Sequence, residues 1–448
     1  MKKVIAKSIA LLLAIMTVCS LAACNGYVKQ TGELDNLDEV PAVSGTIKFS
    51  YETNGQESKE LAANAYIDAF IAKYPNAKVR TDYEYKTSMA DQRISAGTIG
   101  DVFYFAELEA YNYAKTQGVL MPLDHYMKAF KINTDDIYSG IYAAGMIDGK
   151  YYYVARDFNQ MIMTYNKDAL AGGLTEYVKD GWTWETFLSV CEQATNEQFY
   201  GANIDLAYAP TFIPLLNAVG ETDENGRVKT WYNTATRTVD FTSEGMLNAV
   251  QDLLDAYASG YINLNLGSND AFADKKAVFT QHVYVQVESH AKTLEQDQFD
   301  WDMIHLPLTN NPMFGCGSSG VGVYNGTKNA NTAAAFALFF YTQDGQTAFN
   351  GQDGGSVPVL ASLKDADFWQ HAEDDWSDKN WGANIYKSDE YAVIGQWKCI
   401  LPSEVAELID GQPLKQALQE VVGGAKLSDV MGELQEQCNQ KWASLAEK

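Results

Sequence analysis

Aromatic and hydrogen-bonding side chains directly follow the first strand pattern of the sequence. Residues 45–51 alternate apolar and polar side chains, which indicates a β-strand, and Tyr51, Glu52 and Asn54 stand at its end. A tyrosine ring offers a flat apolar face, while carboxylate and amide groups form hydrogen bonds with hydroxyls. These three side chains therefore suit a polyhydroxylated ligand. The alternative is structural, with Tyr51 as a strand-end core residue and Glu52 as a helix cap.

Two later segments carry similar groups. Phe103 and Tyr104 end another strand pattern, and alternation sends only one of the two side chains to the core, so Tyr104 is a candidate ligand contact. Asp157 and Asn159 stand in a charged segment that begins at Arg156, where packing alone explains such side chains poorly. The alternative for this segment is a salt bridge that sets a hinge.

Four further residues complete the set of candidates. Gly317 and Ser318 could donate hydrogen bonds through backbone and hydroxyl groups, although a glycine there could instead allow close strand packing. Tyr208 and Trp381 are aromatic candidates, and aromatic side chains of this kind lie more often in a core than against a ligand.

Enzymatic patterns are weak in this chain. The five histidines form no HExxH pattern and no GxSxG is present, so we expect no catalytic residues, no metal site and no cofactor. Residues 315–320 match GxGxxG, but a strand pattern follows them where a dinucleotide site needs a helix. Asp300 and Asp302 flank Trp301 and leave a secreted glycosidase open as an alternative, because such enzymes use paired carboxylates.

The amino terminus has the order of an export signal. Lys2, Lys3 and Lys7 precede the apolar run 9–18, which is shorter than the about 20 residues that span a bilayer. The run leads to Leu21-Ala-Ala-Cys24, which resembles the lipobox of bacterial lipoproteins. We expect a signal peptide over residues 1–23, lipidation of Cys24, and a flexible tether over residues 24–44. The mature chain would then sit on the outer face of the cytoplasmic membrane, held by its lipid anchor only.

The composition excludes some partners. The formal charge is −25, and removal of the three signal-peptide lysines makes it −25 − 3 = −28. Nucleic acid and anionic lipid headgroups would repel such a surface, so neither is expected as a partner. Four cysteines remain besides Cys24, and their wide spacing predicts isolated buried thiols with one disulfide possible: Cys191, Cys316, Cys399 and Cys438.

Strand and helix patterns alternate through the first half of the chain. Strands are predicted at 45–51, 77–85 and 100–105, with a helix over 61–74 between the first two. Two later helix starts are predicted, one with Thr183 as its N-cap and one over 331–341 with Asn331 or Thr332 as its N-cap. This order is typical of an α/β fold with a parallel sheet, in which ligands bind beyond the carboxyl ends of the strands. About 400 residues follow the tether, which is too many for one core and favours two domains.

An ordered set of phrases resembles the family of bacterial extracellular solute-binding proteins that includes the maltose-binding protein. The phrases are Ser95-Ala-Gly97 with Gly100-Asp-Val102, Gln117 to Asp124, Gly149 to Val154 with Thr164 to Lys167, Trp182 to Phe187, Ala277 to Tyr284, and Gly317 to Gly322. The resemblance implies a two-lobed periplasmic-binding-protein-like fold of type II, with discontinuous lobes and a hinge of crossing strands. It assigns residues 45–160 and 303–350 to the N-lobe, and 161–302 and 351–448 to the C-lobe. The crossings are expected near 158–164, 303–309 and 350–355.

The same resemblance implies a function and a partner. It makes the chain a monomeric substrate-binding lipoprotein of an ABC importer, which captures a carbohydrate by hinge closure and delivers it to the permease subunits. It brings Asp157 and Asn159 to the ligand and makes Tyr284 a stacking aromatic in place of the family's tryptophan. Three alternatives stay open: a non-sugar solute such as a polyol or peptide on the same fold, a surface-anchored glycoside hydrolase, and an adhesin.

Overall fold

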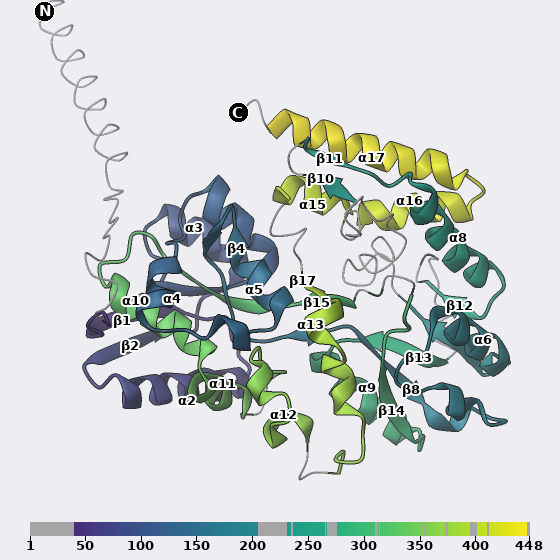
Figure 1. Ribbon diagram of the computed structural model, residues 1–448, viewed down its shortest axis with the longest axis horizontal. Helices are drawn as coiled ribbons and strands as arrows, with labels where there is room; N and C mark the ends of the chain where they lie inside the picture. The colour runs from purple at the N-terminus through teal and green to yellow at the C-terminus, as the bar shows by residue number, and fades with distance from the viewer. Residues whose placement is uncertain are drawn as a thin grey trace, which may run out of the picture.

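Two α/β lobes lie side by side in the computed structural model (Figure 1), which describes residues 40–204, 231–233, 236–264, 266, 276–309, 312, 314–352, 355–371, 375–394, 401–409 and 412–445. Tyr208, Cys24 and Cys399 fall outside the described residues. Each lobe holds a five-stranded mixed sheet, and a small three-stranded sheet lies between them.

The sheet of the first lobe has the order β2-β1-β3-β16-β6. Three of its strands are parallel neighbours, as the alternating sequence pattern predicts: β1 (Gly45–Ser50), β2 (Ala77–Asp82) and β3 (Val102–Ala106). The other two run antiparallel to their neighbours: β16 (Ser319–Val323) and β6 (Val154–Ala155).

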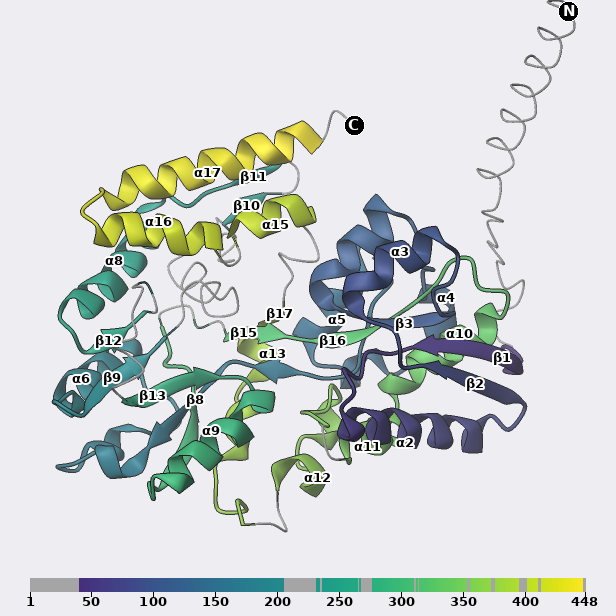
Figure 2. The same cartoon turned by 180° about the vertical axis from the view of Figure 1, so that it is seen from behind.

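Helices cover both faces of this first sheet (Figures 1 and 2). The helix predicted over 61–74 is α2, and it begins four residues earlier than its apolar pattern. The apolar helix α10 begins at Ala330 with Asn329 as its cap residue, not Asn331 or Thr332 as expected. The reason is that the Thr332 hydroxyl instead donates to the Ser44 carbonyl, over 2.7 Å. The helices are α2 (Glu57–Lys73), α3 (Ala90–Ser95), α4 (Asp124–Ala129), α5 (Ser139–Gly145), α10 (Ala330–Leu338) and α11 (Gln343–Asn350).

The sheet of the second lobe has the order β12-β9-β13-β8-β14. Thr183 caps α6 by accepting a hydrogen bond from the Thr186 N–H at 3.2 Å, as predicted. The strands are β8 (Ile162–Asn166), β9 (Phe199–Asn203), β12 (Ile262–Asn263), β13 (Lys276–His282) and β14 (Trp301–His305). The helices are α6 (Trp184–Ala194), α8 (Glu244–Ala258), α9 (Tyr284–Gln296), α15 (Ser403–Ile409), α16 (Gln412–Val422) and α17 (Leu427–Ser444).

The small sheet joins the lobes and gathers three distant segments. Its order is β17-β15-β7, from β7 (Asn159–Gln160), β15 (Phe314–Gly317) and β17 (Ala392–Ile394). Along the chain, β7 lies between β6 of the first sheet and β8 of the second, and β15 lies between β14 and β16, so these two passages between the large sheets run through the small sheet. Figure 2 shows β15 and β17 between the two lobes. Short elements complete the fold: the hairpins β4–β5 (Met146–Ile147, Lys150–Tyr151) and β10–β11 (Tyr232–Asn233, Thr238–Val239), and the one-turn helices α12 (Asp367–Gln370) and α13 (Ser388–Tyr391).

The lobe boundaries given by the resemblance stay a prediction. Residues 303–305, assigned to the N-lobe, lie in β14 and pair with β8 of the second sheet. Val357, assigned to the C-lobe, forms a β-bridge with Phe158, and Trp369 packs in one core cluster with first-lobe residues and with residues of α9 and β14. The third strand of the small sheet comes from residues 392–394 rather than from 350–355.

Candidate functional site

A buried ion pair lies where the first lobe passes into the small sheet. The Arg156 guanidinium is 3.0 Å from the Asp157 carboxylate, and both side chains are almost fully buried. Asp157 also accepts hydrogen bonds from the Ser319 N–H at 2.7 Å and from the Asn159 amide at 3.3 Å. Burial raises the pKa of the Asp157 carboxyl, against the lowering effect of Arg156 and the Ser319 N–H.

Aromatic rings enclose the same guanidinium. Arg156 donates to the Tyr51 hydroxyl at 2.8 Å, and its charge lies 5.4 Å from the Tyr104 ring centre and 4.9 Å from that of Phe349. Tyr51 is 1% exposed, so the structure places it in the core, and Tyr104 is half-buried beside it with ring centres 5.2 Å apart. Of the two tyrosines, Tyr104 is the one with an accessible part.

A second buried carboxylate follows β3. Glu107 accepts a hydrogen bond from the Ser318 N–H at 3.1 Å, and the Ser318 hydroxyl lies 3.1 Å from that of Tyr153. Gly317 is the last residue of β15, directly before Ser318. A Cβ at Gly317 would meet no atom within 4 Å. At Gly320, by contrast, a Cβ would lie 2.2 Å from the Val154 carbonyl oxygen. Close packing therefore explains Gly320 but not Gly317.

Asn159 connects this region to the small sheet. It pairs with Gly317 across β7 and β15, and its side-chain oxygen accepts from the Ser356 hydroxyl at 3.2 Å. Six of the predicted site residues meet here, together with Glu107 and Arg156, which the prediction left out. We call these eight residues the hinge group: Tyr51, Tyr104, Glu107, Arg156, Asp157, Asn159, Gly317 and Ser318.

Glu52 and Asn54 lie at the margin of the hinge group. The Glu52 carboxylate accepts from the Thr87 hydroxyl at 2.8 Å and from its N–H, so Glu52 caps the turn at 87–89 and not α2. Asn54 is exposed and adopts a left-handed backbone, φ 53°. Lys59, in α2, lies in the electric field of both Glu52 and the hinge group. Burial and the charge of Arg156 lower the pKa of Lys59, although Glu52 and Asp157 act in the opposite direction.

Tyr284 and Trp381 belong to a different cluster. Tyr284 begins α9, donates to the Trp369 carbonyl at 3.0 Å, and has its ring centre 5.6 Å from that of Trp381. Trp381 is 3% exposed and stacks on His371, with ring centres 4.1 Å apart and planes 24° apart. The cluster is called the aromatic group below: Tyr284, Trp369, His371, Trp376 and Trp381.

Arg156 and Glu107 are the functional candidates that sequence reasoning missed. Glu107 follows β3 in the way that Glu52 follows β1, so the rule that singled out Glu52 could have found it. Arg156 is adjacent to Asp157, but no local pattern shows that it reaches Tyr51, which is 105 residues away.

The carboxylates considered for glycoside hydrolysis have structural partners. Asp300 forms ion pairs with Lys167 at 2.8 Å and Lys379 at 3.3 Å. Asp302 accepts from the backbone N–H groups of Met303 and Asn380, at 2.8 and 2.7 Å.

The described parts of the chain hold no cluster of three or more His, Cys, Asp or Glu residues suited to a metal ion. Cys191 and Cys438 are buried free thiols, and the buried Cys316 thiol donates to the Phe314 carbonyl at 3.4 Å. Within the described ranges, no helix has both the length and the apolar character that a membrane crossing requires.

Solved structures share this fold at low sequence identity. The sugar-binding protein MalE of Xanthomonas citri superposes with a TM-score of 0.70 at 16% identity, over 90% of this chain and 98% of MalE. An ABC substrate-binding protein of Listeria monocytogenes, in complex with cycloalternan, gives 0.67 at 15% identity, over 89% and 99%. UgpB of Mycobacterium tuberculosis, in complex with glycerophosphocholine, gives 0.66 at 17% identity, over 90% and 100%.

These likenesses confirm the two-lobed type II fold that the sequence phrases predicted. A search of curated protein sequences gave no match. A sequence model described as bacterial extracellular solute-binding protein matches residues 65–376, which cover most of both lobes. The chain therefore belongs to the family of bacterial extracellular solute-binding proteins.

Proposed function

We propose that this protein is the lipid-anchored receptor of an ABC importer and captures a neutral carbohydrate between its lobes. The observation that carries the proposal is the hinge group. Two carboxylates, one amide and the half-buried Tyr104 ring gather beyond the ends of β1 and β3, where the lobes join. Ligands of open α/β sheets bind at this end of the strands.

The chemistry of the hinge group suits hydroxyls better than charges. The charge of Arg156 is neutralised by Asp157, and the Glu107 carboxylate accepts a hydrogen bond from a backbone N–H. The remaining carboxylate and amide oxygens can accept hydrogen bonds from sugar hydroxyls. A neutral ligand also agrees with the acidic mature chain. Among proteins of the same fold, MalE is a sugar-binding protein and the Listeria protein binds cycloalternan.

Capture would proceed by hinge closure. A ligand that contacts both lobes stabilises the closed state, because only that state offers both sets of contacts. Tyr284 and Trp381 would supply aromatic surface from the second lobe. Further contacts would come from Tyr208, and from Glu52 and Asn54 of the first lobe. The receptor would act as a monomer without chemistry of its own, anchored through Cys24 on the outer face of the cytoplasmic membrane, and would deliver its ligand to the permease.

One observation favours a second candidate ligand. UgpB, which has the same fold at 17% identity, is in complex with glycerophosphocholine. A polyol ester is therefore the first non-sugar solute to test.

The test is a thermal-shift screen of residues 25–448 against neutral oligosaccharides and glycerophosphodiesters. The chain starts at residue 25 so that the hydrogen bond from the Ser44 N–H to Thr332 at 3.0 Å is kept. Ligand at 100 Kd stabilises the native state by about 2.7 kcal/mol. A saturable shift with one oligosaccharide, recovered unchanged, supports the receptor. Hydrolysis of that oligosaccharide would contradict it, and a shift with only glycerophosphodiesters would replace the ligand.

A pair of variants then tests the site. Tyr104→Ala removes a half-buried ring of the hinge group, and we expect at least a tenfold loss of affinity, about 1.4 kcal/mol. Tyr83→Ala is the matched control, because Tyr83 lies outside the hinge group and its hydroxyl donates to the Asn64 side chain at 2.6 Å on the exposed surface. Equal losses in both variants would argue against the hinge group as the binding site.

A further inference from the structure

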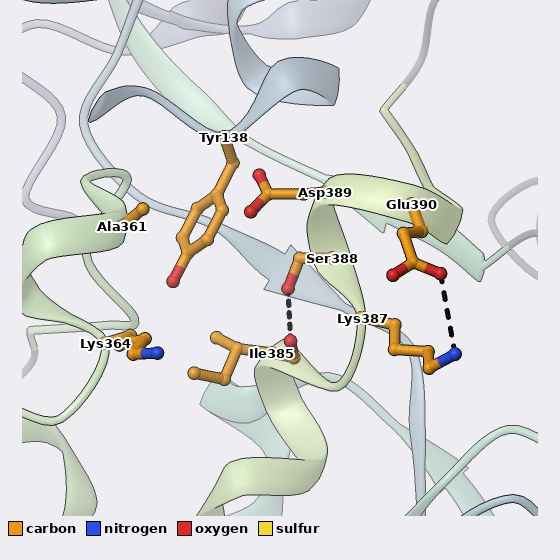
Figure 3. Close-up of a pocket in the computed structure, with 8 residues that line it drawn as sticks. All are labelled: Tyr138, Ala361, Lys364, Ile385, Lys387, Ser388, Asp389 and Glu390. Atoms are coloured by element: carbon orange, nitrogen blue, oxygen red, sulfur yellow. Dashed lines mark hydrogen bonds and ion pairs between the residues drawn. The ribbon is translucent and has the colours of Figure 1, made fainter. Parts of the chain in front are cut away.

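A pocket lies apart from the hinge group and the aromatic group, against the segment that leads into β17. Its volume is about 310 Å³, and three segments line it: Tyr138 before α5, residues 361–364, and residues 385–390. Figure 3 shows these side chains arranged around a common space, with the Tyr138 ring at its upper side. None of the lining residues belongs to the hinge group or the aromatic group.

The Tyr138 hydroxyl is the unusual feature of this pocket. Tyr138 is 4% exposed, and its hydroxyl oxygen has no hydrogen-bond partner among the residues that the structure describes. Figure 3 shows the hydroxyl directed away from Asp389, toward the side formed by Ala361, Lys364 and Ile385. A buried hydroxyl without a partner destabilises the native state unless a bound group satisfies it. Burial, followed by Asp389, Asp136 and Asp365, raises its pKa far above the ordinary value, so the phenol stays neutral.

The charges of the residues that line the pocket balance, two positive against two negative. Lys364 and Lys387 face two acids, Asp389 and Glu390, and Lys387 pairs with Glu390 at 3.5 Å. Ser388 is buried and donates its hydroxyl to the Ile385 carbonyl at 2.5 Å, which leaves the serine oxygen free to accept. A balanced set of ammonium, carboxylate and hydroxyl groups disfavours a charged ligand and matches one with several hydroxyls.

We propose that this pocket is a second binding site, for a neutral polyhydroxyl compound of monosaccharide size. Its volume lies at the lower end of small-molecule sites, which begin at about 300 Å³, and this matches a ligand of monosaccharide size. The ligand would give the Tyr138 hydroxyl its missing partner and would bond the lysine and carboxylate groups at the rim. The apolar part of the wall, from Ala361, Ile385 and the Tyr138 ring, would contact its C–H groups.

Calorimetric titration of residues 25–448 with D-glucose, myo-inositol and glycerol tests the site. We expect saturable binding of at least one probe, weakened about tenfold or more by Tyr138→Phe, which removes only the hydroxyl. Because that hydroxyl is unpaired in the free protein, Tyr138→Phe should melt at the same temperature as the wild type or higher. A folding defect and a binding defect are thus separable.

Tyr142→Phe is the matched control, since Tyr142 lies in α5, one turn after Tyr138, and stacks on Tyr151 with ring centres 5.1 Å apart, outside the pocket. It should bind the probe as the wild type does. A second variant, Ala361→Leu, fills the pocket and should also abolish binding. Binding that survives both Tyr138→Phe and Ala361→Leu would locate the probe elsewhere and overturn the proposal, as would the absence of saturable binding by all three probes.

Discussion

The hinge group and the aromatic group are built from different interactions, although both lie where the lobes meet. In the hinge group, a buried guanidinium and a buried carboxylate are 3.0 Å apart, and each has further hydrogen bonds. In the aromatic group, rings pack with centres 4.1 to 6.5 Å apart, and Tyr284 and Trp381 donate hydrogen bonds to backbone carbonyls. The Tyr284 hydroxyl also lies 3.3 Å from His371 Nε2.

This difference predicts which substitutions each group tolerates. Removing one charge of a buried pair leaves the other without a partner in a dry environment, so the hinge group should be sensitive to charge. Ring packing depends on volume and shape instead, so the aromatic group should be sensitive to ring size and tolerant of a lost hydroxyl. A binding surface made from both can combine directional hydrogen bonds on one side with apolar contact on the other.

The largest effect should come from Asp157. Asp157→Ala leaves the Arg156 guanidinium buried and unpaired, and we expect a loss of about 3–5 kcal/mol in the free energy of unfolding. Urea denaturation followed by circular dichroism measures it.

Asp300→Ala is the control for the loss of an aspartate charge. Asp300 is 50% exposed and pairs with Lys167 at 2.8 Å, and exposed pairs contribute about 0–1 kcal/mol. If the two variants lost similar stability, the buried pair would not hold the hinge group together, and the contrast between the two regions would fail.

Local periodicity predicted the strands and helices that carry the hinge group, and it could not predict their long-range partners. The alternation at 45–51 and the polar cap at Thr183 are properties of neighbouring residues, and both predictions are confirmed. The pairing of β7 with β15 joins residues more than 150 positions apart, and their short segments have no periodic pattern of their own. The predicted lobe boundaries depend on such pairings, which is why β14 lies in the second sheet although residues 303–305 were assigned to the first lobe.

The next largest effect should come from acid, which acts on a histidine pair in the second lobe. His282 and His290 lie beside the start of α9 with ring centres 4.5 Å apart, and burial lowers their pKa values to about 3 and about 4. Below pH 6.5 the two imidazoles bind protons in the unfolded chain but stay neutral in the folded chain. The free energy of unfolding therefore falls as the pH is lowered from about 6.5 to about 4. We expect the two imidazoles together to lower the free energy of unfolding by about 3 kcal/mol between pH 6.5 and 5.

His290→Asn should reduce this pH dependence, because one of the two buried imidazoles is gone and the other loses a repulsive neighbour on protonation. Urea denaturation at several pH values gives the slope for the wild type and the variant. An unchanged slope would mean that other groups cause the loss, and that the histidine pair does not make the second lobe sensitive to acid.

The smallest effects come from two tyrosine hydroxyls, one in each region, and their ratio is informative. Tyr51→Phe leaves the buried Arg156 guanidinium without its 2.8 Å acceptor, which should lower the free energy of unfolding by about 1–3 kcal/mol. Tyr284→Phe removes the donor to the Trp369 carbonyl at 3.0 Å and the contact with His371 Nε2 at 3.3 Å. Tyr284 is half-buried, so water can replace the hydroxyl and the loss should stay below about 1 kcal/mol. The two phenylalanine variants keep both rings, so unfolding measurements compare the hydroxyls alone. A larger loss for Tyr284→Phe would reverse the assignment and make hydrogen bonding, rather than ring packing, the interaction that holds the aromatic group.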